Sequence, residues 1–411
     1  MSNQFDDFSP NQDDFGISSE FAALPICNFE LSPWEKPRKQ WIRKCQWWNL
    51  IERHLIQDQP QQIALIPLRY FGLPGERLLD IRFFLSKLKA HNKSFFFYGI
   101  NNSNNSWSKA QVQLSQVLDI DNGLVVKSSS IGLHDFDELH HVNPTAMQNI
   151  KKNGPFDVIN LDFCDSVISK LLDMKRLDAI KNLLNYQLKT SSGNWLLFIT
   201  TRTAKNTNSA EAFERLSKLL DRNLQDADFK DEFIKYYNEI HEPTTNKIIS
   251  TANITENDHI NIVVIGFVKW LFGLAVACEC SGKLLSILRY DIDDTSSNDM
   301  MSMCLSFKKD IRPLHDPSGV TTPCDNQVNV TEPELAKRSL KKIYETKNVD
   351  SILTSNLDTY KTSLDETLDL LNESGVDTSS YISQLCRKDL VTLGITEEEL
   401  IRKDSMSVNA E

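Results

Sequence analysis

Short apolar segments alternate with amphipathic ones along the first half of the chain. Apolar runs rich in Val, Ile or Phe, and bounded by Gly, Asn or Ser, predict buried strands at 63–70, 94–100, 124–127, 156–161 and 195–199. Leucine-bearing helical patterns lie between some of these runs, at 76–89 and 166–188. Because strands that alternate with helices form right-handed βαβ units, the pattern predicts an α/β fold with a Rossmann-like, doubly wound, mostly parallel sheet.

The second half of the chain is dominated by helical patterns. Residues 207–258 are polar and helical, and residues 262–278 are almost continuously apolar. The apolar stretch is short for a membrane span and contains Lys269, so a buried helix is favoured over a transmembrane one. Two later apolar runs, 284–290 and 300–307, predict an antiparallel β pair that completes the sheet.

These patterns divide the chain into five parts. We expect a disordered acidic lead-in at 1–33, a basic and aromatic helix at 34–58, a Rossmann-like domain at 59–308 with a helical insertion at 205–280, a linker at 309–335, and a helical acidic tail at 336–411. From residue 351 onward, twelve acidic residues face five basic ones. The tail is therefore interpreted as an appendage that contacts a protein partner.

Composition narrows the class of protein. The chain of 411 residues has a net charge of −11, which argues against a generic nucleic-acid binder. Its eight cysteines include no CxxC pair, so a structural zinc site is not expected and a reducing compartment is. The first residues lack the basic and apolar regions of a signal peptide. We expect a cytoplasmic protein that does not enter a membrane.

The basic segment has two interpretations. Residues 34–54 hold six Lys or Arg against two Glu, with four Trp among them. The segment is either a packing helix whose basic side chains reach solvent, or a surface that meets nucleic acid through Lys39, Arg43 and Arg53. In the second case the cations would hold phosphates while the aromatic rings stack on bases.

Candidate binding residues follow the first three strands. Gly72 and Gly75 form a turn where backbone could approach a ligand, although Pro74 lacks an N–H group and the turn is not a GxGxxG motif. Asn101 stands at the end of the second strand, where ribose-binding Rossmann domains carry an acid. Asp135 and Asp137 lie in a loop rich in His and Asp, which is interpreted as a polar loop, a nucleoside contact or a metal site.

The fourth predicted strand has the clearest chemical signal. In the segment FDVINLDF, Asp162 stands at the carboxyl end of the strand and faces the ligand edge of the sheet. A carboxylate at this edge can bind substrate or act as a base. Cys164 lies nearby, and a nucleophilic thiolate there would need a base beside it.

Residues 60–310 resemble class I S-adenosylmethionine-dependent methyltransferases in the turn at 72–75, the strand end at Asn101, the acidic loop and the late β pair. The basic helix and the LDF segment are also similar to three-Cys-motif partner proteins of bacteria. The resemblance implies S-adenosylmethionine on the Gly72–Gly75 turn, Asn101 near its ribose, Asp135 or Asp137 near its adenine, and the catalytic Asp162 at the methyl-transfer centre. The chain departs from the family in its short glycine motif and missing ribose acid. It also lacks the Asp-Pro-Pro-Tyr type of fourth-strand motif, which speaks against amino-methylation of bases.

Three functions are consistent with these observations. The first is a methyltransferase that acts on nucleic acid or a nucleotide-like substrate. The second is a catalytically silent Rossmann-like binding subunit of a larger bacterial assembly, such as a defence system. The third is a nucleotide-dependent hydrolase, against which stands the absence of GxxxxGK[ST] and G-x-S-x-G motifs.

Overall fold

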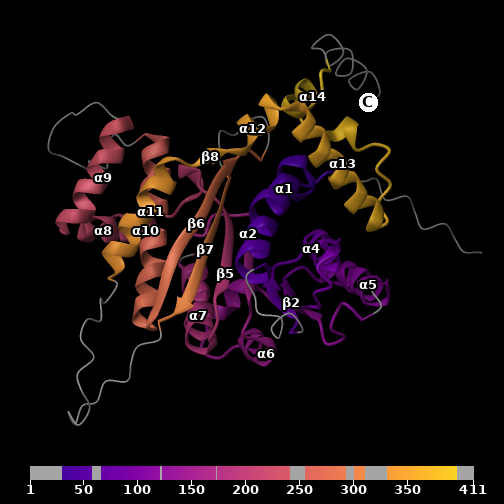
Figure 1. The fold of residues 1–411 in the computed structure, drawn as a ribbon, viewed down its shortest axis with the longest axis horizontal. Helices are drawn as coiled ribbons and strands as arrows, with labels where there is room; N and C mark the ends of the chain where they lie inside the picture. Colours follow the sequence, from indigo (N-terminus) through magenta and orange to yellow (C-terminus); the bar gives the residue numbers. More distant parts are fainter. Residues whose placement is uncertain are drawn as a thin grey trace, which may run out of the picture.

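The computed structural model describes residues 30–57, 66–120, 123–172, 174–240, 255–292, 300–310 and 331–395. Its centre is one eight-stranded sheet in the order β3-β2-β1-β4-β5-β7-β6-β8 (Figure 1). The strands are β1 (Leu68–Gly72), β2 (Phe95–Asn101), β3 (Ser130–Leu133), β4 (Val158–Asp162), β5 (Trp195–Arg202), β6 (Cys280–Tyr290), β7 (Met300–Lys309) and β8 (Lys347–Asn348).

All neighbouring strands pair in parallel except where β7 runs antiparallel between β5 and β6. In register, Tyr70 of β1 lies between Phe97 of β2 and Val158 of β4. Side chains alternate between the two faces, so that Leu196 and Leu197 of β5 enter different cores. The predicted fold is confirmed: the sheet is Rossmann-like and mostly parallel, with a late antiparallel pair.

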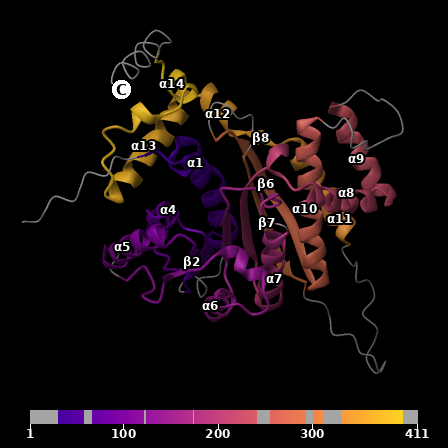
Figure 2. The same cartoon turned by 180° about the vertical axis from the view of Figure 1, so that it is seen from behind.

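Helices cover both faces of the sheet. One face is covered by α6 (Thr145–Asn153), α7 (Lys175–Thr190), α8 (Ala210–Asn223), α9 (Ala227–Ile240), α10 (Glu256–Ala277) and α11 (Glu332–Tyr344). The other is covered by α4 (Leu79–Ala90), α5 (Asn104–Ile120), α12 (Val349–Ser355), α13 (Leu357–Glu373), α14 (Arg387–Thr392) and a helix near the N-terminus. The view from behind in Figure 2 shows the same separation of α8–α11 from α4, α5 and α13.

The helix near the N-terminus follows a short turn, η1 (Pro33–Glu35). It runs through α1 (Pro37–Ile42), η2 (Arg43–Trp48), α2 (Asn49–Ile51) and η3 (Glu52–Ile56) without leaving helical backbone angles. We call residues 37–56 the N-terminal helix. Ile42 and Trp47 are fully buried on it, which fixes the helix firmly against the sheet.

Two elements differ from the sequence prediction. The third strand lies at 130–133, and residues 124–127 contribute only an isolated bridge between Val125 and Phe95. The edge strand β3 was missed because only Ile131 is buried in it, so it lacks a continuous apolar run. The helix predicted at 166–188 begins only at Lys175, because turns and an isolated bridge occupy 167–172.

The described part of the predicted tail, residues 336–395, is not an appendage. Its first helix, α11, packs on α9 and α10, and β8 extends the sheet. Helices α12 and α13 then pack on the opposite face against α1, and Figure 1 shows α13 beside α1. Apolar side chains of the tail therefore belong to both cores. The lead-in at 1–29 and most of the predicted linker, 311–330, lie outside the described residues.

The apolar stretch at 262–278 lies within α10. Among the described helices, α10 alone has the length and apolar composition of a membrane span, and most of it is buried in the protein. Lys269, its basic residue, donates to Asn223 and pairs with Glu332 of α11. These contacts agree with the buried-helix interpretation.

Candidate functional site

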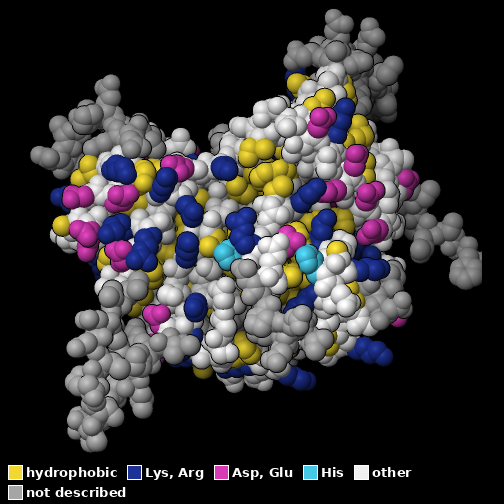
Figure 3. Space-filling model, viewed as in Figure 1, with side chains coloured by type: hydrophobic (Ala, Val, Ile, Leu, Met, Phe, Trp, Pro, Cys, Tyr) yellow, Lys and Arg dark blue, Asp and Glu magenta, His cyan; other side chains and the backbone are white. Residues whose placement is uncertain are grey.

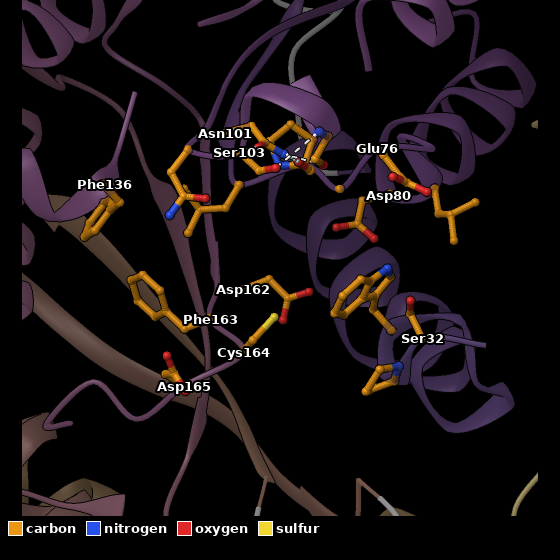
Figure 4. Close-up of a pocket in the computed structure, with 18 of the residues that line it drawn as sticks. Ser32, Glu76, Asp80, Asn101, Ser103, Phe136, Asp162, Phe163, Cys164 and Asp165 are labelled. Carbon is orange, nitrogen blue, oxygen red and sulfur yellow. Dashed lines mark hydrogen bonds between the residues drawn. The ribbon is translucent and has the colours of Figure 1, made fainter. Parts of the chain in front are cut away.

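A cleft of about 740 Å³ opens at the carboxyl ends of β1, β2, β3 and β4. Since β1 and β4 are neighbours whose following connections lead away in opposite directions, the cleft occupies the topological switch point where open α/β sheets bind ligands. Its volume lies within the range of small-molecule sites. Figure 4 shows Asp162, Phe163 and Asn101 around it.

The turn after β1 uses its glycines in different ways. A Cβ atom on Gly72 would lie 2.6 Å from the hydroxyl of Tyr70, so this glycine makes room for a buried ring. Likewise, a Cβ atom on Gly99 of β2 would lie 2.6 Å from Cγ of Pro74, so Gly99 makes room for the proline ring. At Gly75 the nearest atom to a Cβ would be Nε1 of Trp34, 3.8 Å away. Of the two predicted glycines, Gly75 therefore presents open backbone to the cleft, whereas Gly72 serves packing.

Asn101 lines the cleft, yet its side chain holds the loops together. The amide nitrogen donates to the carbonyl of Pro74 at 2.9 Å and to the hydroxyl of Ser106 at 3.1 Å. The amide oxygen accepts from the backbone N–H of Ser103 at 2.9 Å. Asn101 joins the turn after β1 to the loop after β2, which leaves one lone pair of its oxygen for a ligand.

Only one of the two predicted acids after β3 lines the cleft. Asp135 does, and it accepts the backbone N–H of Asp137 at 2.9 Å, which caps the short helix η4 (Phe136–His140). The prediction for Asp137 as an adenine contact is wrong, because Asp137 is buried behind the wall. Both of its oxygens accept from Arg176, at 3.1 and 2.8 Å.

Two aromatic rings that the sequence analysis did not single out form the wall beside Asp135. Phe136 and Phe163 meet edge to face, with ring centroids 5.2 Å apart. The guanidinium of Arg176 lies over the Phe163 ring at 4.6 Å. Each ring directly follows a predicted acid, Asp135 or Asp162, and this spacing is the signal that could have revealed them.

Asp162 stands at the end of β4 and points into the cleft (Figure 4). Its carboxylate accepts from Nζ of Lys39 at 2.5 Å. The Lys39 side chain is 3% exposed and that of Asp162 is 16% exposed, so only the carboxylate still reaches solvent. The ammonium also lies 4.7 Å from the ring centroid of Trp47. The N-terminal helix thus supplies a buried counter-ion to the predicted catalytic residue.

The predicted nucleic-acid surface is not formed by Lys39 and Arg43. Both side chains are buried, and Arg43 pairs with Asp80 at 2.5 Å and donates to the carbonyl of Trp34 at 2.8 Å. Arg53 is exposed and does not line the cleft. The prediction failed because the carboxylates that bind these cations come from other elements of the sheet and of α4.

Cys164 follows Phe163 at the mouth of the cleft and is exposed. The residue reaches solvent, but protein still surrounds much of the thiol. This loss of hydration is the main cause that raises the pKa of the thiol, and the negative charge of the neighbouring Asp162 is the second. A raised pKa disfavours the thiolate that nucleophilic catalysis requires. Elsewhere in the loop after β3, His134 contacts the amide of Asn149 at 3.0 Å. No three potential metal ligands converge in the part of the chain that the structure describes.

The cations that line the cleft have partners within the protein, whereas two of its carboxylates have no ion pair among the described residues. Its cations Lys39, Arg43, Arg77 and Arg176 each pair with a carboxylate, and Arg202 donates to the carbonyl of Cys164. Two carboxylates, Asp135 and Asp165, line the cleft without an ion pair among the described residues. A ligand that brings positive charge therefore finds a partner here, whereas an anionic ligand meets carboxylates and cations already in use.

A family model described as PP_RS20740-like matches residues 28–385. No curated protein matches the chain. Among solved structures, an rRNA methylase from Streptococcus thermophilus matches with 11% identity over 60% of this chain and 91% of that one, at a TM-score of 0.27. An O-methyltransferase from a trans-AT PKS multienzyme of Brevibacillus brevis matches with 11% identity over 86% of this chain and 96% of that one, at a TM-score of 0.28. A SAM-dependent methyltransferase from Methanosarcina mazei matches with 10% identity over 61% and 99%, at 0.26. Since these identities and scores are low, function has to be inferred from the chain's own strand order and cleft.

Proposed function

The chain belongs to the PP_RS20740-like family, and we propose that it is a methyltransferase-like protein that binds S-adenosylmethionine in the cleft at the carboxyl ends of β1–β4. The observation that carries the proposal is the charge balance of that cleft, where Asp135 and Asp165 have no ion pair among the described residues. S-adenosylmethionine brings a sulfonium and an ammonium group against a single carboxylate, so its net charge complements this surplus.

The residues present can divide the ligand between them. Asp135 accepts a hydrogen bond from an exocyclic amine such as that of adenine, and Phe136 and Phe163 bury an aromatic ring. Gly75 offers open backbone beside Trp34, and Asn101 offers one oxygen lone pair to a hydroxyl. When bound, the cofactor supplies an activated methyl group. Asp162 lines the same cleft with one oxygen held by Lys39, and its other oxygen would be able to accept a proton or a hydrogen bond from a methyl acceptor.

Nucleotide phosphates fit this cleft less well. A phosphate would meet the unpaired carboxylates Asp135 and Asp165, and the surrounding cations already have partners within the protein. The Gly72–Gly75 turn also offers few free N–H groups, since Pro74 has none. These features favour the methyl donor over a nucleotide-dependent hydrolase.

The acceptor we propose is not nucleic acid. Two of the three residues that suggested a nucleic-acid substrate, Lys39 and Arg43, are buried in ion pairs. The mouth of the cleft carries the exposed Asp165, which repels phosphates. A small molecule or a peptide that lacks phosphate groups suits this mouth better.

A second candidate function, a silent binding subunit, is favoured by the Lys39–Asp162 pair. A carboxylate whose oxygen is already held by a buried ammonium is less available to an acceptor. In this case the exposed acidic face of α13, formed by Asp365, Asp369 and Glu373, would contact a protein partner. Figure 3 shows acidic side chains gathered over α13.

The proposal is tested by calorimetric titration with S-adenosylmethionine and S-adenosylhomocysteine. The variant Gly75→Val places a side chain in the cleft, where its Cβ atom would lie 3.8 Å from Nε1 of Trp34, which is an ordinary contact. Gly193→Val is the matched control, because a Cβ atom there also meets open space but lies outside the cleft. We expect saturable micromolar binding to the natural chain and the control, and at least tenfold weaker binding to Gly75→Val. No binding up to millimolar ligand would refute the proposal and leave the silent subunit.

A further inference from the structure

The rim of the cleft includes a segment that precedes the N-terminal helix. Ser32, Pro33 and Trp34 line the cleft, and Nε1 of Trp34 lies over Gly75. The next residue, Glu35, is buried and pairs with Arg77 of the turn after β1. The segment 31–35 is therefore joined to the ligand-binding turn. We call it the rim segment.

The rim segment is held in place by the opposite end of the chain. The buried hydroxyl of Tyr381 donates to the carbonyl of Glu35 at 2.6 Å. The side chain of Gln384 accepts from the backbone N–H of Leu31 at 2.8 Å. Both partners lie about 350 positions later in the sequence, between α13 and α14. We call α12, α13, α14 and the connection between α13 and α14 the C-terminal helices. They anchor both ends of the rim segment through its backbone.

The same helices hold the start of the N-terminal helix. The guanidinium of Arg38 pairs with Asp389 at 2.5 Å and with Asp350 at 3.3 Å, and all three side chains are buried. The residue after Arg38 is Lys39, which contacts Asp162 in the cleft. One turn later Arg43 binds Asp80 and the carbonyl of Trp34. A continuous set of contacts therefore runs from the C-terminal helices to the floor of the cleft.

We propose that the C-terminal helices regulate ligand binding in the cleft by positioning the rim segment, with Tyr381 as the principal positioning residue. The inference rests on the proposed function for the identity of the ligand. The coupling between the C-terminal helices and the cleft rests only on the contacts of residues 31–43. A movement of α13 or α14 changes the position of Trp34 over Gly75 and of Lys39 beside Asp162, so a partner that binds these helices changes the affinity of the cleft.

Two buried tyrosines of this region give a matched pair of variants. Tyr381 is 0% exposed and its hydroxyl holds the rim segment. Tyr360 of α13 is 1% exposed, and its hydroxyl has no hydrogen-bond partner among the described residues. The substitution Tyr381→Phe removes a contact with the rim, whereas Tyr360→Phe removes a hydroxyl group without one. Both keep the ring that packs in the core. Gln384→Ala is a milder second variant at a half-buried position, in case Tyr381→Phe folds poorly.

The first measurement is hydrogen–deuterium exchange of the full chain without ligand. In Tyr381→Phe we expect several-fold faster exchange in residues 31–39 and in the turn 73–77, with unchanged exchange in β4 and β5. Tyr360→Phe should behave like the natural chain, and Gln384→Ala should show a smaller effect of the same kind. Unchanged exchange in the turn 73–77 of both Tyr381→Phe and Gln384→Ala would overturn the coupling.

The second measurement is titration of the same variants with S-adenosylmethionine. We expect five- to tenfold weaker binding to Tyr381→Phe and an unchanged affinity for Tyr360→Phe. Equal affinities, alongside faster exchange, would show that the rim segment does not act on binding and would overturn the proposal. If the natural chain binds no S-adenosylmethionine, the proposed function fails, but the exchange of the turn 73–77 still decides whether the C-terminal helices control the cleft.

Discussion

The pair between Lys39 and Asp162 gives the sharpest test of the site. Asp162→Asn removes the carboxylate but leaves the ammonium of Lys39, whose side chain is 3% exposed, without its counter-ion. Removing one partner of a buried pair costs about 3–5 kcal/mol. Because Asp162 still reaches solvent on the cleft side, we take the lower end, about 3 kcal/mol. For a chain of this length that is a fall of about 4 °C in Tm. Asp162→Asn is therefore expected to lower stability as well as activity.

The reverse change is expected to be milder. Lys39→Met keeps an apolar side chain of similar length beside Trp47 and leaves the Asp162 carboxylate able to turn to water. The expected loss of stability is about 1–2 kcal/mol. In the double variant no unpaired charge remains. The free energy of unfolding lost in the double variant should be about 2 kcal/mol smaller than the sum of the losses in the two single variants. Such non-additivity is the signature of two residues in direct contact.

The assay is denaturant unfolding of the two single variants and the double variant, followed by fluorescence. A control pair joins Lys44 of the same N-terminal helix to Glu366 of α13. These groups are also 2.5 Å apart, but their side chains are 38% and 27% exposed. Its coupling should stay below about 1 kcal/mol. If Lys39 and Asp162 prove additive within about 0.5 kcal/mol, the buried pair is not formed and the account of the cleft floor is wrong.

Three further outcomes follow from the site and the core. Asp135→Asn should weaken S-adenosylmethionine about tenfold in calorimetry while the fold stays intact, because asparagine also caps a helix; an unchanged affinity would move the ligand away from Asp135. Gly72→Val should lower stability measurably, since its Cβ atom would lie 2.6 Å from the Tyr70 hydroxyl, whereas Gly75→Val should unfold at the same denaturant concentration as the natural chain. Burial lowers the pKa of His259, so the folded state gives up this proton more readily than the unfolded chain. Stability should therefore fall as the pH drops below about 6.5, and His259→Phe should reduce that fall; an equally steep pH dependence in the variant would contradict the assignment.

Apart from β6, the strands that the sequence predicted are mostly buried on both faces. β2, for instance, carries Phe95, Phe96 and Phe97, which enter the cores on both sides of the sheet. A run of this kind shows in composition alone. β3 and β8 were missed because edge strands bury few side chains, and β8 pairs through only two residues, Lys347 and Asn348.

The site could be predicted as a place but not residue by residue. The position of Asp162 at the end of β4 follows from the strand pattern, because parallel strands bring their carboxyl ends to one edge. Asp135 comes just after β3, the strand that was missed, so only its place in a polar loop could be predicted. Whether Asp135 or Asp137 faces the cleft depends on the turn of η4 and on Arg176, which lies 39 positions away from Asp137. Neither the turn nor the partner can be read from local spacing.

The basic helix shows why its charge was misassigned. Helical spacing tells which side chains share a face, but it does not tell what that face meets. In residues 34–54 the basic excess has a counterpart in the acidic excess after residue 351. Segments of opposite charge attract, and here they meet inside one chain, in the pairs of Arg38 with Asp389 and of Lys44 with Glu366. In a chain of net charge −11, a basic segment has many internal carboxylates within reach before any external phosphate. The internal carboxylates found in the structure hold the N-terminal helix between the C-terminal helices and the cleft.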